Sequence, residues 1–391
     1  MDQAILVSQR LTVLQVLPAL EGGGVERGTL EVAAHLASRG HRSLVMSAGG
    51  RMVAQLEREG SAHFTWTIGK KSLRTLRLIG PLRRFLEEQQ VDVLHVRSRL
   101  PAWICYLAWR GMAPGRRPRL VTTVHGYYSV GFYSAVMTRG EKVIAVSASI
   151  ADYLRKNYPS LDPSVLRVIP RGIDPVRHHP DYRPSPEWLR DWQTAWPQFV
   201  GKRLLVLPGR ITRLKGHHDF IELLAALKAR VPDLHGVIVG EAETRHRPYL
   251  TELEATAKEK GLENDLTFTG HRGDLREIFS TSALVLSLST QPEAFGRTVL
   301  EALALGVPVA GYARGGVGEL LSMMFPAGNV SPGDRRGLLD TCLRILDTPP
   351  RPAALPEQLE LKHMLEDTLD TYQLLVAAPE QQKGGALAFS R

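Results

Sequence analysis

Cysteine is nearly absent from this chain of 391 residues, since Cys105 and Cys342 are its only two and no C-x-x-C pair occurs. Two distant cysteines argue against a disulfide framework or a structural zinc site. Long apolar runs are missing too: the longest candidate, residues 100–109, is about half of the roughly 18 residues that span a bilayer. The N-terminus shows no basic start, sustained apolar segment or small-residue cleavage site, which predicts no signal peptide. These absences favour a cytoplasmic protein.

Several catalytic signatures are also missing. The sequence holds no GxSxG elbow, no HExxH helix, no GxxxxGK[ST] loop and no DxD pair for a metal–diphosphate site. The doublets His178-His179 and His217-His218 cannot easily place both rings on one metal, so we interpret them as surface residues. We therefore expect neither a metal nor another cofactor.

Positive charge is in excess, with 49 basic and 40 acidic residues and a net charge of +9. Such an excess favours anionic partners, namely nucleic acid, a membrane surface or phosphorylated substrates. Residues 69–85 are rich in basic side chains interspersed with leucines. For the basic residues at 70–84 two interpretations stay open, a solvated surface helix or a face that lies on anionic lipid. Nucleic acid is not expected, because Phe85 is the only aromatic residue in that stretch.

Short apolar runs alternate with helical periodicity along most of the chain. Strands are predicted at 11–18, 42–48, 91–98, 119–126, 142–149 and 166–174, and then at 203–211, 234–241, 265–272, 283–290 and 308–314. Helices are predicted at 26–38, 216–230, 248–260 and 297–305. Strands that are apolar on both faces and separated by helices indicate parallel sheets covered on both sides. The fold class is therefore α/β, with two doubly wound Rossmann-like domains that face each other across a ligand-binding cleft.

Composition marks the domain boundaries. Residues 175–201 hold five prolines and three tryptophans without a strand pattern, which is typical of a connection, with a short helix around Trp188 to Trp192. The predicted parts are a first domain at 1–175, a linker at 176–200, a second domain at 201–355, a helix at 356–376 that returns to the first domain, and a flexible tail at 377–391.

A glycine-rich turn, "ALEGGGVERG", follows the first predicted strand. A dinucleotide fingerprint needs G-x-G-x-x-G, but after Gly22 and Gly24 the third position is Arg27, and Gly28 comes one place late. The second strand also ends without an acidic residue for a ribose hydroxyl. The turn therefore does not predict NAD binding. Its backbone N–H groups suit a phosphate or a sugar hydroxyl, and a tight turn without a ligand is the alternative.

Charged residues follow several other strands. His125 ends the strand at 119–126, while Arg210 and Lys215 flank the first strand–helix junction of the second domain. Two cations beside a helix N-terminus predict a diphosphate site. Glu293 lies in a loop before a predicted helix and Glu301 lies inside that helix, whose first N–H groups are free for an anion. A solvated or structural role is the alternative for each of these residues alone.

Together these motifs resemble the GT-B glycosyltransferases of family 4. The resemblance rests on Arg210 with Lys215-Gly216, on "EAFGRTVLE", "ALALGVPVA" and "GGVGELL", and on "PALEGGGVER", "VHG", "VSAS" and "VIPRGID" in the first domain. It covers roughly residues 11–345. It implies a retaining, metal-independent transfer of a hexose from a nucleotide diphosphate sugar, with UDP preferred, to a saccharide or lipid-linked acceptor. Lipopolysaccharide-core and related cell-envelope hexosyltransferases are the members most similar in style.

The resemblance also implies which residues act. The first domain would bind the acceptor and the second the nucleotide sugar. Arg210 and Lys215 would hold the diphosphate, Glu301 the ribose and Glu293 the donor sugar, while His125 would approach the reacting sugar. Backbone at Gly23, Gly24, Phe295, Gly296, Arg297 and Thr298 would support the phosphate and sugar, and the turn from Gly270 to Arg272 would line the base.

Some positions depart from the family pattern. Glu241 and Glu243 stand where members commonly have glycines, which can alter the base side of the pocket. Arg171 replaces a frequent asparagine and could meet an anionic substrate. A sugar-nucleotide epimerase or a phosphorylase on the same architecture is the alternative function.

Overall fold

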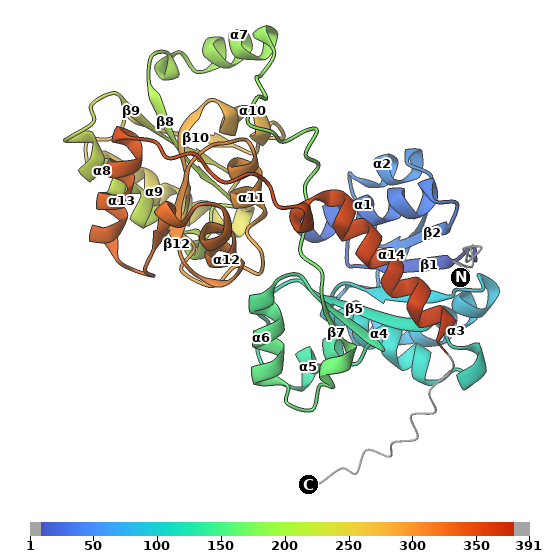
Figure 1. Cartoon of the computed structure of the whole chain (residues 1–391). Coiled ribbons are helices and arrows are strands. Elements are labelled where there is room, and N and C mark those ends of the chain that lie inside the picture. The colour runs from blue at the N-terminus through green and yellow to red at the C-terminus, as the bar shows by residue number, and fades with distance from the viewer. Residues whose placement is uncertain (1–8, 379–391) are drawn as a thin grey trace. The chain divides into compact units, whose positions relative to one another are not determined.

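The computed structural model describes residues 9–378 (Figure 1), so most of the predicted tail at 377–391 lies outside the described residues. The chain divides into two compact units. Unit 1 comprises the described residues up to Ala145, residues Leu154–Ile169, and the described residues from Leu365 onward. Unit 2 comprises Val146–Tyr153 and Pro170–Met364.

Unit 1 is built on a parallel sheet of seven strands in the order β3-β2-β1-β4-β5-β6-β7. The strands are β1 (Thr12–Val16), β2 (Arg42–Ser47), β3 (Ala62–Thr65), β4 (Val93–Val96), β5 (Arg119–Val124), β6 (Lys142–Ala145) and β7 (Leu166–Val168). The six strands predicted here are confirmed. Strand β3 was not predicted, because this edge strand is partly exposed and carries no apolar run. The strand order reverses between β1 and β4, which is where doubly wound sheets bind ligands.

Helices connect the strands of this sheet (Figure 1). They are α1 (Gly24–Ser38), α2 (Val53–Arg58), α3 (Ile79–Glu88), α4 (Arg99–Arg110), α5 (Phe132–Ala135) and α6 (Ala148–Asn157). For the basic residues at 70–84, one of the two interpretations was a solvated surface helix, and the segment is helical from Leu73 onward. A turn leads to the 3₁₀ helix η1 (Leu73–Leu78) and then to α3. The helical run starts there because the side chain of Ser72 accepts the backbone N–H of Arg74.

The final helix, α14 (Leu361–Ala377), packs on unit 1 although unit 2 precedes it in the chain. Tyr372 is fully buried, and its hydroxyl lies 2.6 Å from Nδ1 of His95 on β4. Asp367 of the same helix accepts a hydrogen bond from Arg167 on β7 at 2.6 Å. These contacts hold the returning chain against strands that are some 200 residues or more earlier in the sequence.

Unit 2 repeats the architecture with a parallel sheet of six strands in the order β10-β9-β8-β11-β12-β13. The strands are β8 (Arg203–Pro208), β9 (Leu234–Val239), β10 (Leu266–Gly270), β11 (Ser282–Ser287), β12 (Val309–Tyr312) and β13 (Asn329–Val330). The helices are α7 (Pro186–Ala195), α8 (His217–Lys228), α9 (Arg247–Glu259), α10 (Leu275–Ser280), α11 (Arg297–Ala304), α12 (Gly315–Met324) and α13 (Arg335–Asp347). The five predicted strands and the short helix α7 are confirmed, whereas β13, only two residues long, was not predicted.

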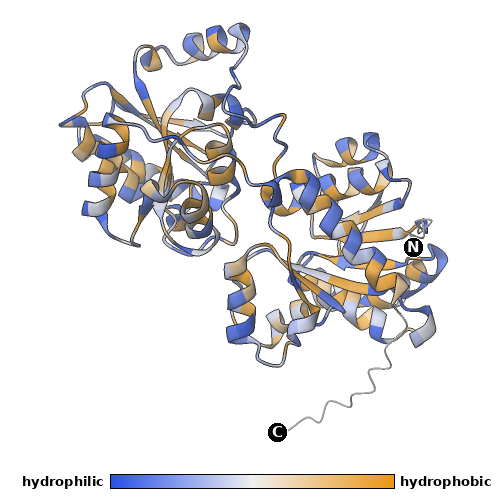
Figure 2. Cartoon of the chain, viewed as in Figure 1, coloured by the Kyte–Doolittle hydropathy of each residue, from blue (hydrophilic) through white to orange (hydrophobic). Residues whose placement is uncertain are grey.

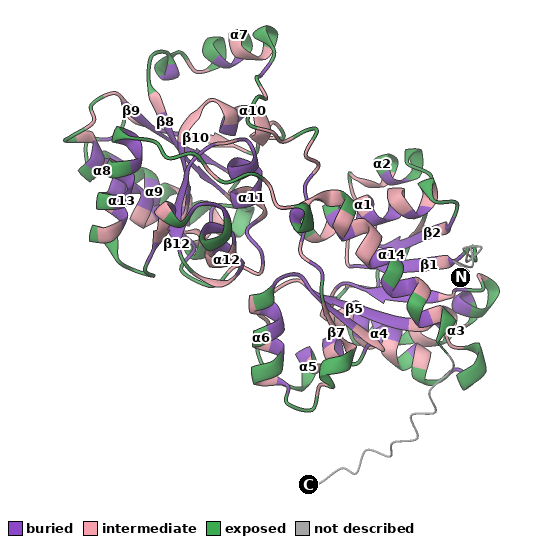
Figure 3. Cartoon of the chain, in the orientation of Figure 1, coloured by how far each residue is buried: buried purple, intermediate pink, exposed green. Residues whose placement is uncertain are grey.

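Each sheet forms the core of its unit. The strands are mostly hydrophobic in Figure 2 and mostly buried in Figure 3. Val13 and Val93 in unit 1, and Val206 and Val285 in unit 2, are fully buried on central strands. Both sheets therefore show the two-sided burial that the apolar runs predict. Among the described residues no helix is both long and apolar enough to cross a membrane.

Candidate functional site

An ion pair between Lys215 and Glu293 lies beside the carboxyl ends of strands β8 and β11. The Lys215 Nζ donates to the Glu293 Oε1 at 2.7 Å, and the two side chains are only 29% and 24% exposed. Ser289 donates a second hydrogen bond to the same carboxylate oxygen. Burial alone raises the pKa of Glu293, but the Lys215 charge and the two hydrogen bonds outweigh it, so this pKa lies below its usual range. Glu293 is therefore a fixed anion beside a fixed cation.

Two glycines bring this pair together. Gly216 follows Lys215 with a φ of 75°, and a Cβ there would lie 2.0 Å from the carbonyl oxygen of Leu288. Gly296 has a φ of 90° and caps α11, where a Cβ would lie 2.8 Å from Val317. Both positions require a left-handed backbone and leave no room for a side chain. Helices α8 and α11 consequently begin close to the strand ends, and their first N–H groups are available to an anion.

Helix α11 carries three of the other predicted residues. Arg297 and Thr298 are half-buried in its first turn, next to the buried Phe295. Glu301 lies one turn further on and is 4% exposed, with its carboxylate 3.2 Å from Nε of Arg297. A buried, oriented carboxylate of this kind is suited to accept hydrogen bonds from a diol. The structure thus places Glu293 and Glu301 at the two ends of one short loop–helix segment.

Arg210 lies just after β8 but is not paired with the predicted site residues. Its guanidinium Nη1 is 3.2 Å from Oε1 of Glu243, and its side chain is 72% exposed. The Lys215 side chain nevertheless lies against the backbone just before Arg210. A Cβ on Gly209 would be 3.4 Å from Cδ of Lys215. Glu243 thus forms an ion pair with Arg210, one of the two cations predicted to bind a diphosphate. Glu243 is also one of the two glutamates at positions where the family commonly has glycine.

The turn predicted to line a base is anchored to helix α7. Gly270 ends β10 with a φ of 71°, and Arg272 donates from Nε to Asp274 at 2.9 Å. Asp274 also accepts a hydrogen bond from the indole N–H of Trp188 at 2.7 Å, and the Arg272 guanidinium lies 5.4 Å from the ring centroid of Trp192. These contacts therefore fix the Arg272 side chain against α7. A ligand at this turn would contact its backbone.

Three residues that lie near the predicted sites were not predicted from the sequence. Ser289, which supports Glu293, could have been found, since it lies at the end of the strand predicted at 283–290. Arg314 follows β12 and donates to the backbone carbonyl of Thr290, and it is the last residue of the strand predicted at 308–314. Arg51 in unit 1 lies against Gly22, where a Cβ would be 2.5 Å from its Nη2. No local signal marks Arg51, because the glycine turn it contacts is some 30 residues earlier.

The predicted residues of unit 1 follow β1 and β5. Gly23 and Gly24 begin α1. His125 is half-buried directly after β5, and its backbone N–H donates to the Tyr128 hydroxyl at 3.4 Å. Arg171, considered as a substrate contact, is buried in unit 2 and donates from Nη1 to the sulfur of Met364 at 3.7 Å.

The interpretation of His217 as a surface residue is wrong. The side chain is fully buried on α8, with Nδ1 3.2 Å from the carbonyl oxygen of Thr212, and burial lowers its pKa to about 4. His218 is half-exposed and pairs with Glu252 at 2.9 Å. Among residues 9–378, no group of three histidine, cysteine or carboxylate side chains is arranged to hold a metal ion.

Two protein families match the sequence, one in each half of the chain. Residues 22–177 match Glycosyltransferase Family 4, and residues 190–359 match Glycosyl transferases group 1. The chain belongs to the GT-B glycosyltransferases of family 4. It is a transferase that uses a nucleotide sugar, and its two parallel sheets with their helices are the GT-B architecture that the motifs predict.

Two solved structures share the fold of this glycosyltransferase over nearly the whole chain, and a third relative matches part of its sequence. A glycosyltransferase structure from Rickettsia africae ESF-5 is 28% identical with a TM-score of 0.81, covering 95% of this chain and 100% of that chain. Anabaena Alr3699/HepE, solved in complex with UDP and glucose, is 22% identical with a TM-score of 0.74, covering 93% and 99%. The lipopolysaccharide core biosynthesis mannosyltransferase LpsB of Rhizobium meliloti is 28% identical over 231 residues, which are 57% of this chain and 60% of LpsB.

Proposed function

We propose that this glycosyltransferase moves a hexose from a UDP-sugar to a saccharide or lipid-linked acceptor in cell-envelope glycan synthesis, such as that of a lipopolysaccharide core. The transfer retains the anomeric configuration and needs no metal ion. The observation that carries the proposal is the Lys215–Glu293 pair held between the starts of α8 and α11. The UDP in the Anabaena structure and the name of the Rhizobium relative support the nucleotide and the acceptor class.

Departure of the nucleoside diphosphate is the step that the site assists. As the bond between the sugar and the phosphate breaks, negative charge develops on the leaving oxygens and positive charge on the sugar ring. Lys215, Arg210 and the N–H groups that begin α11 supply fixed positive charge and dipoles for that diphosphate. A divalent metal performs this task elsewhere, and these groups suit a sequence without a DxD pair. Arg210 exchanges its contact with Glu243 for the phosphate.

The state of Glu293 favours attack of the acceptor from the face that the diphosphate leaves. A double displacement would need a carboxylate free to bond to the anomeric carbon. Glu293 accepts hydrogen bonds from Lys215 and Ser289 and has a lowered pKa, which makes it a weak nucleophile. Its role is therefore to orient a donor-sugar hydroxyl, while the leaving phosphate takes the proton of the acceptor.

The remaining predicted residues have binding roles. Glu301 accepts hydrogen bonds from the ribose hydroxyls, and the backbone from Gly270 to Arg272 lines the base. Gly23 and Gly24 approach the diphosphate or the acceptor, and His125 approaches the reacting sugar. The basic residues at 70–84 hold the enzyme on an anionic membrane surface, at the cytoplasmic face, where a lipid-linked acceptor is found.

A thermal-shift series tests the donor site. The full chain is heated with UDP, GDP, ADP or NAD, each with and without magnesium, because a ligand that binds the folded state raises the melting temperature. Selective stabilisation by UDP without magnesium is expected. A shift only with GDP or ADP overturns the UDP assignment, a shift only with magnesium overturns metal independence, and no shift overturns the site. Release of UDP from a UDP-sugar only when an acceptor is added then separates transfer from epimerisation.

A further inference from the structure

The excess positive charge of this chain comes from two stretches of unit 1. Residues 60–86 contain six basic residues and residues 93–140 contain seven, and neither stretch contains an aspartate or a glutamate. The rest of the sequence holds 36 basic and 40 acidic residues, so it is slightly acidic. A neutral mixture of charges would be the ordinary state of a soluble surface. The charge is therefore concentrated on one part of one unit.

The two stretches are neighbours in the fold. Helix α4, from the second stretch, packs against both η1 and α3 from the first. Helix α4 also contacts the segment around α5. The Trp103 indole N–H donates to the carbonyl oxygen of Tyr133 at 2.8 Å, and the ring centroids of Trp103 and Phe132 are 4.8 Å apart. The turn before η1, the outer side of α4 and the start of α5 thus form one connected region.

This region also exposes large apolar side chains. Leu73 is 86% exposed and Phe132 is 77% exposed. Six of the twelve large apolar side chains that residues 9–378 expose belong to it, namely Leu73, Leu76, Leu107, Val130, Phe132 and Tyr133. We call these residues, with Lys70, Lys71, Arg74, Arg77, Arg99 and Arg110, the aromatic–basic surface. Because large exposed apolar side chains cost free energy in water, their gathering at one place marks an interaction surface.

Arginines and aromatic rings are combined within this surface. The Arg99 guanidinium lies 4.7 Å from the ring centroid of Tyr128 and 5.3 Å from that of Tyr133, and Arg110 lies 5.9 Å from the ring centroid of Tyr106. Rings with a polar end, together with cations on long apolar stems, are the side chains that favour the boundary between lipid headgroups and acyl chains.

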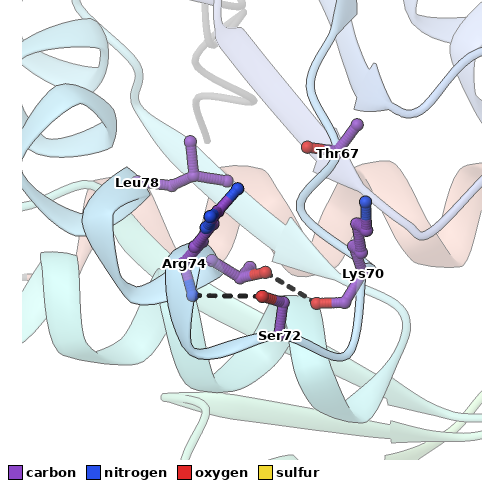
Figure 4. Close-up of a pocket in the computed structure, with 6 residues that line it drawn as sticks. Thr67, Lys70, Ser72, Arg74 and Leu78 are labelled. Carbon is purple, nitrogen blue, oxygen red and sulfur yellow. Dashed lines mark hydrogen bonds between the residues drawn. The ribbon is translucent and has the colours of Figure 1, made fainter.

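A small pocket opens within the turn that precedes η1. It has a volume of about 170 Å³ and is lined by Thr67, Lys70, Ser72, Arg74, Thr75 and Leu78. Figure 4 shows Lys70 and Arg74 on the two sides of the turn at Ser72, with both side chains extending the same way. The Thr75 hydroxyl donates to the carbonyl oxygen of Lys70, so two cations and the hydroxyls of Thr67 and Ser72 remain for the oxygens of a phosphate group. The pocket therefore has the chemistry to hold a single lipid phosphate next to the exposed Leu73.

We propose that the aromatic–basic surface inserts into the interfacial layer of an anionic bilayer. Leu73, Val130 and Phe132 enter the edge of the acyl region, while Lys70 and Arg74 hold a lipid phosphate. This inference extends the membrane contact proposed above from residues 70–84 to α4 and α5, and so rests on the proposed function. A second copy of the chain is not the occupant, because two surfaces without a single acidic residue repel each other. Nucleic acid would leave the exposed aliphatic side chains without a partner.

Vesicle flotation of the full-length chain tests the proposal. Vesicles of phosphatidylcholine alone are compared with vesicles that also contain phosphatidylglycerol. The insertion variant is Leu73→Ser/Phe132→Ser, and the charge variant is Lys70→Gln/Arg74→Gln. Matched controls in unit 2 are Val176→Ser, which removes an exposed apolar side chain, and Lys258→Gln/Arg336→Gln, which removes two exposed charges.

Binding to the anionic vesicles is expected for the wild type and for both controls. The insertion variant should bind at least tenfold more weakly, because it removes two apolar side chains, each of which loses its burial in the membrane. The charge variant should lose about fivefold per charge, as a basic residue near an anionic membrane contributes about 1 kcal/mol.

Three results would overturn the proposal. One is an absence of wild-type binding to anionic vesicles. Another is an insertion variant that binds like the wild type, because the contact is then electrostatic only. The third is a charge variant that binds anionic vesicles like the wild type, since Lys70 and Arg74 then hold no lipid phosphate. The UDP thermal shift measured on the same proteins separates the two proposals: if it is absent while flotation succeeds, the donor site fails and the membrane surface stands.

Discussion

Replacing Lys215 by methionine tests the donor site most directly. Lys215→Met keeps the length of the side chain but removes its charge, and it leaves the Glu293 carboxylate, only 24% exposed, without its cation. The loss of one preorganised positive group at a leaving oxygen typically costs about 10²–10³ in kcat, or about 3–4 kcal/mol. We expect a loss of that size at saturating donor, measured as the UDP released per enzyme in the presence of acceptor.

The same variant also loses folding stability. The paired side chains are largely shielded from solvent, so we expect a cost of about 1–2 kcal/mol at neutral pH, less than for a fully buried pair. A carboxyl group with a lowered pKa stabilises the folded state above its unfolded pKa of 4.5, and this stabilisation disappears as the pH falls through the folded pKa. Urea unfolding should therefore separate the wild type from Lys215→Met at pH 7 and bring them closer together near pH 4.

A second ion pair of unit 2 provides the matched control. Lys228 Nζ lies 2.7 Å from Oδ1 of Asp265, the same distance as in the Lys215–Glu293 pair, and its side chains are 19% and 24% exposed. Lys228→Met should lose a similar amount of stability without a comparable loss of kcat. Near wild-type turnover in Lys215→Met, or an equal loss of turnover in both variants, would refute the diphosphate role of Lys215.

Three further predictions concern neighbouring features. Arg210→Ala should lower kcat strongly but leave the urea midpoint nearly unchanged, because the Arg210 side chain is mostly exposed; a normal kcat would remove it from the site. Gly216→Ala should prevent the loop from closing, since its Cβ would lie 2.0 Å from a carbonyl oxygen in a left-handed backbone, and unchanged thermal stability would contradict this geometry. Burial lowers the pKa of His217 to about 4, so as the pH falls this imidazole is protonated in the unfolded chain before it is protonated in the folded one. The free energy of unfolding therefore decreases below pH 6.5, by about 2 kcal/mol between pH 7 and pH 5. His217→Gln should flatten that pH dependence in urea unfolding, and an unchanged profile would show that other groups cause it.

Local patterns were enough to predict the two sheets but not their edges. Eleven strands were predicted from apolar runs, because central strands of a parallel sheet are buried on both faces and need such runs. The edge strands β3 and β13 are short or partly exposed and carry no comparable signal. Among the basic residues at 70–84, the cap at Ser72 decides where the helical run starts, and periodicity does not record such a cap.

The sequence by itself determined which residues follow the strands, and therefore which side chains reach the carboxyl edge of each sheet. It also determined the glycines at 216 and 296, because only glycine allows those backbones. The tertiary structure decided which of these residues meet. Lys215 pairs with Glu293, 78 positions later, whereas Arg210 pairs with Glu243. Likewise it buried His217 and joined η1, α4 and α5 into one surface. Such contacts depend on strand order and loop closure between distant segments, which no local pattern of residues specifies.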